Sequence, residues 1–358
     1  MDVDGPVLKP GTTINLGDQL STMVASGVES IRVAFSWAAA QPYASFSGMP
    51  AAQKAQFTDV GGVPTDFQLT DSVVGEAARD HLSVLPTVLY APSWDARPTS
   101  NPHGFAVPRQ TAPYAAFLTA LIGRYGPHGS FWQQNPSIPK VPIRSWQIWN
   151  EPNISRYWNQ PFAPSYVTLL RAAHTAVKNA DPGAQVVLGA LTNAAWSSLH
   201  SIYRVRGARS QFDVVSVNAF TKLPPNVIVY LRYVRSMMKR YGDAHKPLIA
   251  TEVSWPSGAG VDTQSYDFDT TRAGQARNIA ELLPLIGRNR LALGLSGFDY
   301  YTWMGDERAG NPAFDFAGLL SYRSGQVTAK PALAAFRTGV LALEGCRSKG
   351  AVATSCIR

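Results

Sequence analysis

The sequence has little cysteine, little charge and no long apolar run. Only two of its 358 residues are cysteine, and Asp, Glu, Lys and Arg together make up 16% of the chain. So low a charge disfavours a coiled coil or a long helical rod, while a hydrophobic share of 45% excludes an intrinsically disordered chain. No segment approaches the roughly 18 to 20 apolar residues of a membrane span, which predicts a soluble protein.

The positive charge is scattered rather than grouped. The formal net charge is +8, and the arginines and lysines that carry it occur singly, without a basic block or a basic helix. The sequence therefore offers no support for nucleic-acid binding, and it shows no sign of an obligate protein partner. The six histidines share no predicted strand end and have no H-E-x-x-H or H-x-H spacing, so we expect neither a metal nor a cofactor.

The two cysteines, Cys346 and Cys356, lie ten residues apart near the end of the chain. A zinc site would need four ligands, and no histidine lies near them. A disulfide worth about 2–3 kcal/mol is the favoured interpretation, with two free thiols in a cytosolic protein as the alternative. Since a disulfide favours an exported location, and Met1 runs into Asp-Val-Asp-Gly as a chain would after removal of a leader, we expect a secreted or extracellular protein.

Short apolar runs alternate with longer segments of helical periodicity. The runs are continuously apolar, which is typical of parallel strands covered on both faces. Strands are predicted at 30–37, 82–90, 142–151, 184–191, 212–220, 246–255 and 295–303, with a short eighth strand at the start of the chain. Helices are predicted at 18–27, 67–80, 112–126, 166–181, 226–242, 270–287 and 331–345.

This alternation predicts an α/β protein, and eight such strands predict a single (β/α)8 TIM barrel domain over residues 1–358. A doubly wound open sheet is the rival fold, but no G-x-G-x-x-G follows the first strand and no Walker motif occurs. A bare barrel needs about 250 residues, so roughly a hundred are surplus. They fall in an insert at 127–141 and mainly in enlarged strand-to-helix connections at the C-terminal face, at 38–64, 91–110, 152–164, 256–269 and 304–330.

Two glutamates stand at predicted strand ends. The fourth strand ends in Trp-Gln-Ile-Trp-Asn-Glu, which places Asn150 and Glu151 at the barrel mouth, and the seventh places Glu252 there. A lone glutamate at such a position is most simply a helix cap or an ion-pair partner. Two opposed carboxylates, however, are what glycoside hydrolysis requires, one to protonate the leaving oxygen and one to act at the anomeric carbon.

Tryptophan follows several of the same strands. The chain has nine Trp, fourteen Tyr and fifteen Phe, and a large core can absorb many of these rings. Most tryptophans nevertheless lie near a strand terminus, and the apolar C–H faces of sugars stack on aromatic rings. We therefore expect some of these rings to contact substrate, with Trp37, Trp94, Tyr301 and Trp303 as the candidates.

The chain resembles the clan A retaining (β/α)8 glycoside hydrolases, and it is most similar to family 39 and its exopolysaccharide-hydrolase relatives. The resemblance is carried by GVESIRVAFSW, WQIWNEPN, GDAHKPLIATEVSW and the tail from FDYYTWMGDERAG to TAKPALAAF. It implies a glycosidase that works by double displacement, with Glu151 as general acid/base and Glu252 as nucleophile. It also implies that Asn150 binds the sugar 2-hydroxyl and that Arg32 orients Glu252 and holds it ionised.

One segment departs from this family pattern. Many relatives carry His-Pro-Tyr at the end of the sixth strand, where the tyrosine hydrogen-bonds the nucleophile, whereas this chain has Asn218-Ala219-Phe220. Phe220 has no hydroxyl, so we expect the missing support from elsewhere, with Tyr266 and Tyr301 as candidates, and we place Asn218 in the sugar subsite. The alternative function is a catalytically silent carbohydrate-binding protein on the same barrel. The sugar, the anomer and the choice between endo and exo action cannot be read from the sequence.

Overall fold

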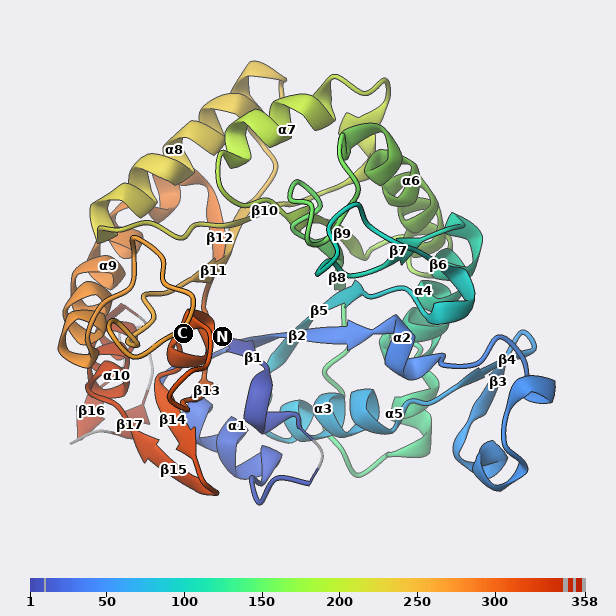
Figure 1. Ribbon diagram of the computed structural model, residues 1–358, viewed down its shortest axis with the longest axis horizontal. Helices are drawn as coiled ribbons and strands as arrows, with labels where there is room; N and C mark the ends of the chain where they lie inside the picture. Colours follow the sequence, from blue (N-terminus) through green and yellow to red (C-terminus); the bar gives the residue numbers. More distant parts are fainter. Residues whose placement is uncertain (10, 344–346, 350–351, 356–358) are drawn as a thin grey trace. The chain divides into compact units, whose positions relative to one another are not determined.

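The computed structural model describes residues 1–9, 11–343, 347–349 and 352–355. Both cysteines, Cys346 and Cys356, lie outside these described residues, so the disulfide stays a prediction. Within the described ranges parallel strands alternate with helices, which confirms the predicted α/β class (Figure 1). None of the helices in this part of the chain is both long and apolar enough to cross a membrane.

The predicted strands are present, and they are shorter than predicted. One sheet has the order β1-β2-β5-β8-β9 and a second the order β10-β11-β12. Every residue of β8 and β9 after the first is buried, as expected of parallel strands covered on both faces. The strands are β1 (Asp2–Val3), β2 (Ser30–Ser36), β5 (Ser83–Leu89), β8 (Ser145–Asn150), β9 (Gln185–Ala190), β10 (Val215–Asn218), β11 (Leu248–Val253) and β12 (Leu295–Tyr300).

Most helices occupy the segments predicted for them. These are α1 (Leu16–Val24), α3 (Gln68–Arg79), α4 (Thr111–Tyr125), α6 (Ala163–Ala180), α8 (Pro224–Arg240), α9 (Arg272–Leu293) and α10 (Pro331–Leu343). Helix α9 continues past its predicted end and stops at Gly294, whose φ of 58° suits glycine. Three further helices were not predicted: α2 (Trp37–Ala40), α5 (Ser130–Gln134) and α7 (Ala195–Tyr203). Helix α7 is a short helix of nine residues that begins without a side-chain cap hydrogen bond.

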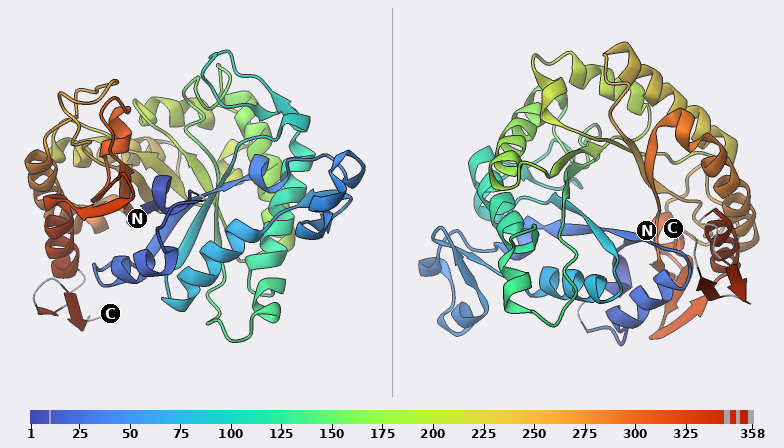
Figure 2. Two further views of the ribbon diagram at one scale, coloured as in Figure 1. Left: turned by 60° about the horizontal axis from the view of Figure 1, so that its bottom comes forward. Right: turned by 180° about the vertical axis from the view of Figure 1, so that it is seen from behind.

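The contacts of the chain form two compact units. Unit 1 comprises Met1–Arg32 and Val217–Arg358, and unit 2 comprises Val33–Ser216. In unit 1, α9 lies between α8 and α10 and packs on β12 (Figures 1 and 2). In unit 2, α6 packs against β8, β9 and α4 (Figure 1). The single domain over residues 1–358 stays a prediction.

The connections that follow strands are long and carry structure of their own. Between β2 and α3 lies the hairpin β3 (Thr58–Val60) and β4 (Val63–Thr65), and between β5 and α4 the pair β6 (Ala96–Arg97) and β7 (Val107–Pro108). The connection after β12 holds a small sheet of β13 (Met304–Asp306), β14 (Leu320–Arg323) and β15 (Gln326–Ala329), and the chain ends in β16 (Arg347–Lys349) and β17 (Val352–Ser355). Short paired segments in loops lack the apolar runs by which the longer strands were recognised.

Candidate active site

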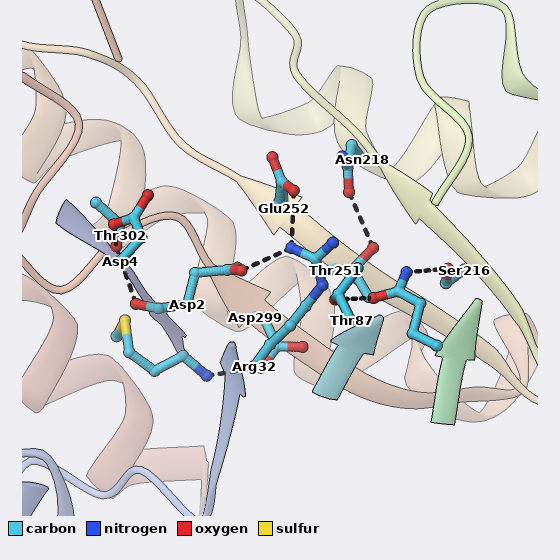
Figure 3. Close-up of polar contacts among 12 residues, drawn as sticks. Asp2, Asp4, Arg32, Thr87, Ser216, Asn218, Thr251, Glu252, Asp299 and Thr302 are labelled. Carbon is cyan, nitrogen blue, oxygen red and sulfur yellow. Dashed lines mark hydrogen bonds and ion pairs between the residues drawn. The ribbon is translucent and has the colours of Figure 1, made fainter. Parts of the chain in front are cut away.

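Glu252 is buried near the end of β11 in unit 1. It is the penultimate residue of the strand and only 9% exposed. Arg32 on β2 donates a hydrogen bond of 2.7 Å from Nη1 to Glu252 Oε1 (Figure 3). An arginine in this position holds the carboxylate in one orientation, as the family resemblance implied.

A second carboxylate, Asp2 of β1, shares the same arginine. Arg32 Nη1 lies 2.6 Å from Asp2 Oδ1, and the side chain of Asp2 is buried (Figure 3). Within the described part of the chain, the other oxygen of Asp2 has no hydrogen-bond partner. Sequence reasoning missed Asp2 because β1 is too short to show a pattern, although a first strand must end at the same edge as its parallel neighbours.

Burial is the largest influence on the pKa values of Glu252 and Asp2. It raises the pKa of Glu252 above its ordinary value, although Arg32 and the amide of Asn218 oppose the shift. It raises the pKa of Asp2 further, again against Arg32. Burial by itself lowers the pKa of Arg32, but the two carboxylates outweigh it and hold that pKa above the usual value. Arg32 thus favours the ionised form of Glu252, whereas desolvation of the carboxylate is the larger effect and gives the net upward shift of its pKa. That Glu252 is ionised stays a prediction.

Asn218, at the end of β10, supports Glu252 from another side. Its Oδ1 accepts a hydrogen bond of 2.9 Å from Thr251 Oγ1, which fixes the orientation of the amide (Figure 3). The amide also hydrogen-bonds Glu252 and favours its ionised form. Asn218 is fully buried, and its amide positions the carboxylate of Glu252. Its placement in the sugar subsite stays a prediction.

Two tyrosines were expected to replace the hydroxyl missing at Phe220, and the contacts described for their side chains are with residues other than Glu252. Tyr301 hydrogen-bonds Asp4, which also accepts a bond of 2.6 Å from Thr302 Oγ1 (Figure 3). Burial raises the pKa of Asp4, and its charge in turn disfavours ionisation of Glu252. Tyr266 is 37% exposed and stacks on Phe268. The hydrogen bonds described for Glu252 thus come from Arg32 and Asn218, and the hydrogen bond described for the Tyr301 side chain goes to Asp4.

Glu151 belongs to unit 2, where it follows β8 and is 9% exposed. Its φ is 43° and that of Trp149 is 70°, so both neighbours of the buried Asn150 adopt a conformation that costs a non-glycine residue about 1–3 kcal/mol. The turn is held by a bond of 2.9 Å from Glu151 N to Ala190 O and one of 2.8 Å from Trp149 Nε1 to Tyr157 O. Backbone strain of this kind concentrates at functional sites, and no sequence pattern signals it. That Glu151 faces Glu252 stays a prediction.

The tryptophans near strand ends are mostly core residues, which corrects the expectation for Trp37 and Trp303. Both rings are fully buried. Trp37 Nε1 donates to Gln41 Oε1 at 2.7 Å, and Trp303 Nε1 donates to Gln19 Oε1 at 2.9 Å, so each ring is anchored inside its own unit. Of the three tryptophan candidates Trp94 is the partly exposed one, and its ring meets that of Trp37 edge-on with the centroids 5.6 Å apart. A position at a strand end therefore does not distinguish an exposed ring from a core ring: Trp37 packs against Tyr114 and Phe117 of α4, and Trp303 hydrogen-bonds Gln19 of α1.

The group around Glu252 is suited to acid, base or nucleophilic chemistry. Three carboxyls with raised pKa values, those of Asp2, Asp4 and Glu252, lie around the single guanidinium of Arg32. Perturbed carboxyls beside a fixed cation are typical of active sites. Nowhere in the described residues do three or more His, Cys, Asp or Glu side chains form a group that could hold a metal ion.

Comparison with known proteins finds similarity in structure and not in sequence. No family model matches the chain, and no curated protein does. Among solved structures, a monomeric β-xylosidase from Caulobacter crescentus CB15 superposes with a TM-score of 0.65 at 18% identity, over 94% of this chain and 66% of that one. A family 39 glycoside hydrolase from the gut symbiont Bacteroides cellulosilyticus WH2 gives 0.63 at 17% identity, over 95% of this chain and 62% of that one.

A third solved structure has a lower TM-score, but this chain covers a larger share of it. The family 53 catalytic domain from Ignisphaera aggregans gives a TM-score of 0.57 at 20% identity, over 90% of this chain and 88% of that one. The chain thus spans slightly less than two thirds of the two longer proteins. At these identities the likeness concerns the fold. It agrees with the resemblance to family 39 and with the expectation of a glycosidase.

Proposed function

We propose that the chain is a retaining glycoside hydrolase that cleaves O-glycosidic bonds in a poly- or oligosaccharide. The observation that carries the proposal is the buried pair of Arg32 and Glu252, 2.7 Å apart at the end of β11, in a fold that β-xylosidases and other glycoside hydrolases share. The names of those structures support a carbohydrate substrate. Because the positive charges of the chain are scattered, we propose no nucleic-acid partner.

The scaffold we propose is a closed (β/α)8 barrel. Two sets of hydrogen bonds support closure, each within one unit. In unit 2, Leu188 N donates to Val214 O at 2.9 Å, which joins β9 to the segment that leads into β10. In unit 1, Trp303 N donates to Asp2 O at 3.1 Å, which joins the segment after β12 to β1. Closure would bring all the strand ends to one rim, as catalysis by residues of the fourth and seventh strands requires.

In the proposed mechanism Glu252 attacks the anomeric carbon and Glu151 protonates the departing oxygen. Arg32 and Asn218 aim Glu252 at the reacting carbon and stabilise its ionised form. Once the ester forms, Glu252 carries no charge, and Glu151 accepts a proton from the water that releases the sugar. Asn150 binds the 2-hydroxyl, an interaction that strengthens in the transition state. We further propose that the protein is secreted and that Cys346 and Cys356 form a disulfide.

The test is a panel of polysaccharides followed by proton NMR of the first product. We expect hydrolysis of at least one glycan, with the released sugar initially in the anomeric configuration of the substrate, because two displacements at one carbon restore it. An inverted first product would overturn the double-displacement mechanism. Glycan binding without any turnover, unchanged in Glu151→Gln, would support the silent binding protein instead.

The pH dependence follows from the raised pKa of Glu252. The nucleophile must be ionised, so kcat/KM should rise with pH along an acid limb whose midpoint lies above the ordinary value of 4.5. The limb reports Glu252 together with Asp2, because the two share Arg32. Asn218→Ala removes a hydrogen bond to the ionised form and should move the limb to higher pH, whereas the exposed Asn226→Ala should not. A limb below 4.5, or a downward shift in Asn218→Ala, would contradict this assignment.

A further inference from the structure

Five aromatic rings of unit 1 pack together on the connections that follow β10, β11 and β12. We call them the aromatic cluster: Phe220, Tyr266, Phe268, Tyr301 and Phe314. Phe220 follows β10, Tyr266 and Phe268 lie between β11 and α9, and Tyr301 follows β12. Phe314 lies on a short 3-10 helix (Ala313–Phe316) further along the same connection. Rings that are far apart in the sequence thus meet in one place.

The core of the cluster is a stack of three rings. Phe268 stacks on Phe220 at 5.5 Å between centroids with an interplanar angle of 17°, and on Tyr266 at 5.0 Å with 12°. Phe314 meets Phe220 edge-on at 5.1 Å and Tyr301 at 5.7 Å. Such mutual packing holds the rings in fixed orientations, so a ligand would not have to order them.

These rings are not sealed in the core. Tyr266 is 37% exposed and the other four are partly exposed, whereas Trp303, on the same connection as Tyr301, is fully buried. Contiguous apolar surface that remains open to solvent commonly marks a binding site.

The cluster adjoins the strand that carries Glu252. Ala219 N, next to Phe220, donates to Glu252 O at 2.8 Å, and Tyr301 N donates to Val253 O at 3.1 Å. The main chain next to Phe220 and the main chain of Tyr301 are therefore both hydrogen-bonded to β11. A molecule that reacts at Glu252 and extends beyond it on this side would meet the cluster.

The charge around the cluster restricts what can bind. The connection from 254 to 271 contains Asp262, Asp267 and Asp269 and no lysine or arginine. Burial and the neighbouring Asp262 and Asp267 raise the pKa of Asp269 to about 6, which is still below neutral pH. On the connection after β12, Arg308 is paired with Asp306, and Glu307 is paired with Lys330 and with Arg272 of α9. An anionic sugar would be repelled here, whereas a neutral one would not.

We propose that the aromatic cluster is a stacking subsite for a neutral sugar unit, joined to the sugar that reacts at Glu252. The apolar C–H face of that unit lies on the open ring surface, and its neutrality suits the aspartates of the same connection. The proposal rests on the proposed function, since it assigns the cluster to the substrate of that site. It also predicts a preference against chains of uronic acids.

The experiment measures binding by isothermal titration calorimetry in a Glu151→Gln background, so that a ligand is not consumed. The probes are xylotetraose, cellotetraose and β-1,4-galactotetraose, with tetragalacturonic acid as the anionic probe. We expect at least one neutral probe to bind, and Tyr266→Ala and Phe268→Ala each to weaken it about tenfold. Tyr266→Phe keeps the ring and should keep the affinity. Tyr233→Ala, which removes a 54% exposed ring from α8, is the matched control and should have no effect.

Three results would overturn the subsite: no binding of any neutral probe, unchanged affinity in both alanine variants, or equal affinity for tetragalacturonic acid. Tyr266 is exposed enough that its replacement leaves folding intact, so a folding defect in Phe268→Ala alone would not obscure the result. The two proposals also fail separately. If binding depends on the rings but the unsubstituted enzyme shows no turnover, the proposed hydrolase activity is refuted and the subsite is supported. If turnover is normal but binding does not depend on the rings, the subsite is refuted and the hydrolase activity is supported.

Discussion

Glu252→Ala is expected to lower kcat/KM by about 10⁴-fold or more, because it removes the group that forms the covalent intermediate. The protein should still fold, since Arg32 keeps its contact of 2.6 Å with Asp2 after the substitution. Initial rates on an activated glycoside, together with circular dichroism of the variant, measure both expectations. Glu281→Ala, which changes an exposed glutamate on α9, is the matched control and should be fully active.

The configuration of the product formed with azide distinguishes the nucleophile from the general acid/base. In Glu252→Ala the anion enters the space left by the carboxylate and attacks the anomeric carbon directly, which should restore some activity and yield a glycosyl azide of inverted configuration. In Glu151→Ala azide instead attacks the glycosyl-enzyme on the face that water uses, so the azide product should retain the configuration. Activity of Glu252→Ala equal to that of the unsubstituted enzyme on a true substrate would refute its assignment as the nucleophile.

Arg32→Met is expected to destabilise the protein by about 3–5 kcal/mol, because it leaves Asp2 and Glu252 buried without their cation. The sign of its pH dependence follows from linkage. Both carboxyls have folded-state pKa values above the unfolded ones, so they bind protons more tightly in the folded state, and lower pH favours folding. Loss of Arg32 widens this difference, and the destabilisation should be larger at pH 7 than at pH 5. Urea unfolding at the two pH values measures it.

Two further variants distinguish the loss of the buried cation from a general loss of stability caused by any substitution of arginine. Arg79→Met breaks an exposed pair with Glu76, and because such pairs contribute little, stability should change by no more than about 1 kcal/mol. Asp2→Asn added to Arg32→Met removes one of the two uncompensated carboxylates and should recover part of the lost stability. A double variant that is less stable than Arg32→Met would show that Asp2 does not carry the buried charge we assign to it.

The sequence by itself determined the class of fold and the main chemistry-bearing residues. Continuous apolar runs such as 184–191 are typical of parallel strands covered on both faces, and the alternation with helices follows from period and capping signals. Since parallel strands present their ends at one edge, Asn218 and Glu252 could be assigned to strand ends, and Arg32 to the second strand, before any contact was known. Signals of this kind are local, so they can be read along the chain.

Only the tertiary structure decided what surrounds those residues. It placed Asp2 and Asp4 around Arg32 and Glu252, buried Trp37 and Trp303, and made burial the dominant influence on the pKa of Glu252. It also assembled the aromatic cluster from rings on three connections that are far apart in the sequence. The physical reason is common to all of these. Burial, desolvation and ring packing depend on which distant segments cover a side chain, and a residue's own neighbours in the sequence do not carry that information.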